Sequence, residues 1–197
     1  MEDLVVAAAA LAQQHLDIPE LGSRWRHVQA VGARADDLTH AINLADRTVI
    51  VAAAWLHDLG YAPDLVDTGM HAIDGARHLQ RCGYPRRVIA LVAHHSGSRF
   101  EAAERGLTEA LAEFPYEDGM ASDVLATADL TAGPQGQPMT FDARLDEILH
   151  RYPPHTPVHK AMRRARPELA AQIRRVAESL QQVDVVAAED RVFKRDR

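Results

Sequence analysis

The sequence predicts an all-α protein that folds as a single compact bundle of helices. Alanine, the residue with the highest helix propensity, occupies 34 of the 197 positions, and aromatic residues make up only 5%. No segment alternates apolar and polar residues over a long stretch, as a half-buried strand would. A chain of this length favours one domain with a continuous core. We expect this domain to cover residues 1–182, and the sequence leaves open whether the tail, residues 183–197, is ordered.

Helix-breaking and capping residues divide the chain into a series of expected helices. These helices are expected at about residues 3–16, 23–35, 41–56, 68–82, 85–96, 120–131, 143–152 and 157–182. Pro19 and Gly22 interrupt the chain after the first helix, and Ser23 can cap the second, in which apolar residues recur at helical spacing. The third helix has a broad apolar face, and Gly60 provides its stop.

The fourth, fifth and sixth helices are delimited by similar signals. Asp67 or Thr68 can cap the fourth helix, which Gly83 terminates. Pro85 suits the first turn of the fifth helix. The sixth helix precedes a glycine- and proline-containing breaker at residues 133–136, so we expect a turn there.

The last two expected helices are bounded by prolines and polar caps. Asp142 can cap the first of them, which Pro153 stops. Thr156 can cap the final helix, and Pro157 suits its first turn. Because proline in a helix interior removes a hydrogen bond and causes a clash, we expect a break at Pro167.

Charge and composition exclude several classes of function. The net charge is -6, so nothing in the overall balance predicts a nucleic-acid partner. Residues 151–197 are basic, with 11 Lys and Arg against 6 Asp and Glu, which suits either a solvated helix face or attraction to a phosphorylated molecule. The longest apolar runs are too short to span a membrane. An acidic start and a single cysteine, Cys82, favour the cytoplasm.

The strongest chemical signal is the pair His57-Asp58, which directly follows an apolar run. The chain contains 11 histidines, and several stand at the ends of apolar helices. Burying an imidazole and a carboxylate without partners would cost several kcal/mol. A divalent cation would compensate both groups, so the pair indicates a metal site. One ion can accept both consecutive residues only if the helix ends or distorts there, which Gly60 permits.

Two more residues can complete this site. His27 lies between apolar residues of the second expected helix, and Asp129 lies in an otherwise nearly apolar segment. With His57 and Asp58 they offer two nitrogen and two oxygen ligands, and leave coordination positions for water and a substrate oxygen.

The order His27, His57-Asp58 and Asp129 on a helical chain resembles the HD-domain superfamily of metal-dependent phosphohydrolases. The match covers roughly residues 20–135, and its most specific part is His-Asp followed by Leu-Gly. The resemblance implies an HD-type helical bundle in which these four residues hold one metal ion.

Many members of this superfamily add two histidines that bind a second ion. The resemblance assigns His71 to the first position and His95 to the second, with His94 as the competitor of His95. Asp58 would then bridge two ions. Nitrogen ligands favour a divalent transition metal such as iron, manganese, cobalt or nickel, and one or two ions are expected.

The resemblance implies hydrolysis of a small phosphate ester, most plausibly a nucleotide or dinucleotide. Water activated by the metal at Asp58 would act as the nucleophile. Candidates to bind the phosphate are Arg24, Arg26 and Arg99. The alternative is that these are ordinary surface arginines without a role in binding. Asp74 could orient a ligand imidazole from outside the ligand set.

Other functions and states stay open. The same ligand types serve the diiron oxygenase branch of the superfamily, and a silent site could sense a ligand without turnover. Ser96–Arg99 stands where the cyclic-dinucleotide phosphodiesterases carry a Gly-Tyr-Pro extension, so that activity is not expected. A homodimer is also left open.

Overall fold

The computed structural model describes residues 2–42 and 44–193, and the side chains within residues 3–183 apart from residue 43. In this part of the chain there is no β-strand, so the all-α prediction is confirmed. The described residues form ten α-helices: α1 (Glu2–Leu16), α2 (Gly22–Ala41), α3 (Arg47–Leu56), α4 (His71–Arg81), α5 (Arg86–His94), α6 (Ser98–Arg105), α7 (Thr108–Leu111), α8 (Met120–Leu130), α9 (Phe141–Arg151) and α10 (Pro157–Phe193). Within the described residues, no helix combines the length and apolar character needed to cross a membrane.

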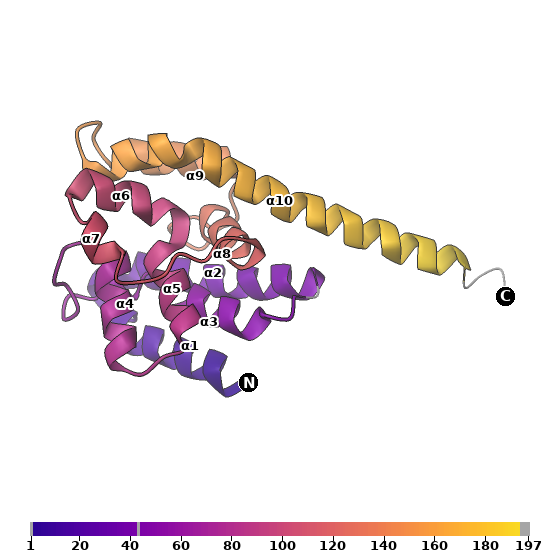
Figure 1. Cartoon of the computed structure of the whole chain (residues 1–197), viewed down its shortest axis with the longest axis horizontal. Helices are drawn as coiled ribbons and strands as arrows, with labels where there is room; N and C mark the ends of the chain where they lie inside the picture. The colour runs from indigo at the N-terminus through magenta and orange to yellow at the C-terminus, as the bar shows by residue number, and fades with distance from the viewer. Residues whose placement is uncertain (1, 43, 194–197) are drawn as a thin grey trace.

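Helix α3 lies at the centre of the bundle. It packs against α1, α2, α5 and α8, as the arrangement in Figure 1 also shows. Its residues from Ile50 to Ala54 are buried, as is Leu56. A helix that is apolar on nearly every side is stable only when other helices surround it. The residues that follow α3 therefore emerge in the interior of the protein.

A second, smaller apolar cluster attaches the C-terminal helices. It is formed by buried residues of α8, α9 and α10, among them Leu130, Leu145 and Leu169. Helix α10 also packs along α6 and α8, and its C-terminal part extends beyond the rest of the bundle in Figure 1. The cluster holds α9 and the start of α10 beside the end of α8.

Several helix boundaries differ from the sequence expectations. Helix α3 begins at Arg47 rather than near residue 41, because α2 continues to Ala41. Helices α6 and α7 were not predicted, because their segments are short; α6 packs on α10 and α5, and α7 packs on α6. Thr140, rather than Asp142, caps α9 by accepting a hydrogen bond from the Ala143 backbone N–H. At α4 the residue before the helix is Met70, which has no side-chain cap bond.

The expected break at Pro167 does not occur. Helix α10 runs continuously from Pro157 to Phe193, so it also passes the end that we expected near residue 182. Residues of α10 on both sides of Pro167 are buried, Ala165 and Leu169 among them, so packing offsets the lost backbone hydrogen bond. The cap at Thr156 is confirmed, because its hydroxyl accepts from the His159 N–H. The last four residues of the expected tail, 194–197, lie outside the described residues.

Gly60 allows the chain after α3 to lie against the start of α4. A Cβ at this position would overlap the His71 carbonyl oxygen and lie 2.6 Å from the Gly75 backbone nitrogen. Both obstacles are backbone atoms, so no side-chain rearrangement could make room. The absence of a side chain at residue 60 therefore permits the close approach of this turn to the start of α4.

We predict that Gly60→Ala destabilises the protein by about 1–3 kcal/mol, the range for overpacked interiors. The matched control is Gly22→Ala, whose Cβ would meet only the Arg26 guanidinium at 3.8 Å. Urea unfolding of both variants measures the difference. Wild-type stability in Gly60→Ala would contradict the close approach described here.

Candidate metal centre

Six histidine and aspartate side chains meet in the interior of the bundle. They form two groups in which the ligand atoms lie within 4.8 Å of one another: His27, His57 and Asp129 in one, and Asp58, His71 and His95 in the other. His27 comes from α2 and Asp129 from α8, His57 and Asp58 directly follow α3, His71 begins α4, and His95 directly follows α5. These are the six positions that the sequence predicted as metal ligands.

The first group has distances suited to one ion. His27 Nε2 lies 3.0 Å from Asp129 Oδ1, and His57 Nε2 lies 3.9 Å from the same oxygen. Asp58 Oδ2 is 3.3 Å from His57 Nε2 and 3.9 Å from His27 Nε2. Donors that share an ion at 2.0–2.2 Å lie roughly 3–4 Å apart, so all four can reach one centre.

The second group lies on the other side of Asp58. His71 Nε2 is 3.5 Å from Asp58 Oδ1 and 3.2 Å from His95 Nε2. The two oxygens of Asp58 thus face different sets of histidines. This orientation suits a carboxylate that bridges two ions. It depends on α3 ending at Leu56, because consecutive residues of a regular helix would point His57 and Asp58 about 100° apart.

Backbone carbonyls fix the histidine rings with Nε2 facing the centre. The Nδ1 atoms of His27, His57 and His95 lie 3.1, 2.7 and 2.6 Å from the carbonyl oxygens of Gly133, Ala54 and Val92. Because a carbonyl only accepts, each Nδ1 carries the proton and each Nε2 of a neutral ring has a free lone pair.

His57 Nε2 is the strongest sign that a ligand belongs here. It is completely buried and has no hydrogen-bond partner among the described residues. A buried polar atom in this condition costs free energy unless something absent from the protein chain binds it. The donor set of imidazoles and carboxylates fits a divalent transition metal.

The electrostatics of the buried site keep the carboxylates charged. Burial raises the pKa of Asp58, but Arg24 and His57 outweigh burial and hold that pKa well below its usual range. The pKa of Asp129 is likewise lowered, against burial, by His27 and His57. Burial lowers the pKa of His71 to about 3, so this ring is neutral at neutral pH and can act as a ligand.

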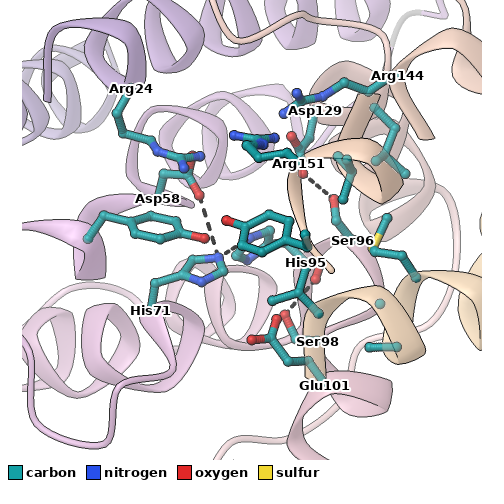
Figure 2. Close-up of a pocket in the computed structure, with 18 residues that line it drawn as sticks. Arg24, Asp58, His71, His95, Ser96, Ser98, Glu101, Asp129, Arg144 and Arg151 are labelled. Carbon is teal, nitrogen blue, oxygen red and sulfur yellow. Dashed lines mark hydrogen bonds and ion pairs between the residues drawn. The ribbon is translucent and has the colours of Figure 1, made fainter. Parts of the chain in front are cut away.

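The centre lies at the base of a pocket, shown in Figure 2. Arg24 donates to Asp58 Oδ2 over 2.6 Å, and its guanidinium lies 3.9 Å from the ring centroid of Tyr61. The Tyr61 ring stacks on His71 with centroids 4.1 Å apart. Tyr61 therefore positions both Arg24 and His71, a role that the sequence analysis did not identify.

Ser96 has an unusual backbone conformation beside the centre. Its φ of 45° is positive although it is not glycine, which costs about 1–3 kcal/mol unless the surroundings stabilise it. The Ser96 hydroxyl donates to Asp129 Oδ2, and this bond is marked in Figure 2. The turn also ends α5 so that His95 enters the site.

Four other predicted residues lie away from the centre. Arg26 donates a hydrogen bond to Gln135, and Arg99 forms an ion pair with Glu168. Neither arginine lines the pocket. The carboxylate of Asp74 accepts bonds from Thr68 and Gly69 and contacts no ligand imidazole. His94 Nε2 donates to the Phe114 carbonyl, 2.9 Å away, which leaves His95 as the histidine that faces the ligand groups.

Two further cationic residues of the pocket were not identified from the sequence. Arg144 and Arg151 lie on α9 and line the pocket with Tyr152. The spacing of these arginines with Ile148 could have indicated them. Residues 144, 148 and 151 fall on one helical face, which therefore carries two cations beside an apolar residue.

Comparison with known proteins gives one match. A family model described as HD domain matches residues 24–188, which is most of the chain. No curated protein and no solved structure matches it.

We predict that the protein binds two divalent ions per chain, one for each ligand group. His95→Ala should lose the ion between His71 and Asp58 and keep the other, because the first group does not use His95. Elemental analysis after manganese loading and desalting measures the ratio.

The adjacent His94 provides the matched control. His94→Ala should keep both ions, because its ring faces the Phe114 carbonyl. Equal metal content in His94→Ala and His95→Ala would contradict the assignment.

Proposed function

The chain belongs to the HD domain family, and from that premise we propose that it is a metal-dependent phosphohydrolase acting on a small phosphate ester, with nucleotides and dinucleotides as the favoured substrates. The observation that supports the proposal most is the pair of ligand groups between which Asp58 lies, one oxygen facing each group, with the His57 Nε2 atom buried and unpartnered among the described residues. The six ligand residues, the cytoplasmic location and the extent of the domain are parts of this proposal.

The residues around the centre suit hydrolysis of a phosphate ester. Divalent ions, when bound, supply a water of lowered pKa and positive charge for the phosphoryl oxygens. Asp58 and Asp129 remain ionised and the buried imidazoles of His71 and His95 remain neutral, so these groups are ready to act as ligands. Arg24 lines the pocket and can donate to a phosphoryl oxygen while it holds Asp58.

Asp58→Asn tests the proposal directly. The variant keeps the shape of the side chain but removes the charge that both ligand groups share, so we expect the kcat/KM for phosphate release to fall by about 10²-fold or more. The measurement is phosphate release from a panel of nucleotides, cyclic nucleotides and dinucleoside polyphosphates with iron, manganese, cobalt or nickel. The exposed His155 provides the control variant, His155→Ala, which should keep full activity.

Three results would contradict a phosphohydrolase. Absence of phosphate release with every metal and substrate would exclude the activity tested. Oxygen consumption by the iron-loaded protein would favour the diiron oxygenase alternative. Tight nucleotide binding without turnover would favour a ligand-sensing domain.

A further inference from the structure

Two arginines from α9 enter the pocket above the proposed metal centre. Arg144 is only 3% exposed, whereas Arg151 is at the more exposed end of the helix. In Figure 2 the side chains of Arg24, Arg144 and Arg151 lie along the upper side of the pocket, and His71, Ser98 and Glu101 lie along the lower side. The ligand set of the metal centre uses neither arginine of α9.

Among the described residues, the two arginines of α9 share a single ion-pair partner, Glu147. Arg144 and Arg151 both pair with the same oxygen of Glu147, at 2.5 and 3.1 Å. One carboxylate thus serves two guanidinium groups. In addition, Arg144 Nε is buried and has no hydrogen-bond partner within the described residues. A buried guanidinium with an unused donor and a shared counter-ion is suited to bind an anion.

The neighbouring wall of the same pocket is apolar. It is formed by Ile148 and Tyr152 at the end of α9 and by Val158 and Met162 at the start of α10. The Tyr152 ring lies 5.3 Å from the Arg151 guanidinium carbon. Cation and aromatic surface are therefore adjacent, an arrangement suited to a molecule with an anionic group beside a flat, apolar one.

We propose that α9 and the start of α10 form a two-part substrate site, in which Arg144 and Arg151 bind phosphoryl oxygens and Tyr152 with Met162 contacts a planar leaving group. The inference rests on the proposed function and narrows its substrates to phosphate compounds that carry a ring system, such as nucleoside phosphates. Glu147 positions the two guanidinium groups without contacting the substrate.

Binding measurements separate the two parts of the site. The probes are inorganic phosphate and adenosine monophosphate, titrated by calorimetry into the metal-free protein and into the manganese-loaded protein. Arg151→Gln should weaken both probes about tenfold, because it removes charge-assisted hydrogen bonds to phosphate. Tyr152→Ala should weaken adenosine monophosphate about tenfold and leave inorganic phosphate unchanged, because stacking involves only the base.

The matched control is Arg166→Gln, which removes an arginine of α10 that pairs with Asp142 outside the pocket. This variant should bind both probes like the wild type. Unchanged affinity in Arg151→Gln, or equal losses for both probes in Tyr152→Ala, would overturn the two-part site. A protein that binds no metal but shows Arg151-dependent phosphate binding would refute the proposed hydrolase and support the arginine subsite.

Discussion

The buried carboxylate of Asp58 is the constraint on which the rest of the site depends. It stands between two sets of imidazoles, and among the described residues Arg24 is the arginine that binds one of its oxygens. A carboxylate in this position is unfavourable unless further positive charge is near. The two ligand groups, the unpartnered His57 Nε2 and the orientation of the histidine rings are all explained by bound divalent ions.

Helix ends, rather than helix faces, bring the ligands together. His57, His71 and His95 stand where α3 ends, α4 begins and α5 ends, and backbone carbonyls left unpaired near helix ends fix the His57 and His95 rings. Gly60 permits the close contact of α4, and the positive φ of Ser96 ends α5 beside Asp129. The site therefore requires several local departures from regular helix, each held by the packed core.

The sequence predicted the helical fold, and the six residues that it proposed as ligands lie together in the structure, because a polar residue within an apolar run has few explanations. His57-Asp58 and Asp129 are of this kind. Arg26 and Arg99 were proposed from their closeness in sequence to His27 and His95, but their helices point them away from the pocket. Arg144 and Arg151 could not be placed, because only the tertiary packing of α9 on α8 and α10 brings them to the site. Similarly, the continuity of α10 through Pro167 depends on its neighbours rather than on local propensity.

Whether Asp58 bridges two ions can be tested by anomalous X-ray scattering from crystals of the manganese-loaded protein. We expect two anomalous peaks, one between His27, His57 and Asp129 and one between His71 and His95, each facing a different oxygen of Asp58. Peaks only at other positions, or a metal-free Asp58 bound by Arg24 alone, would contradict it.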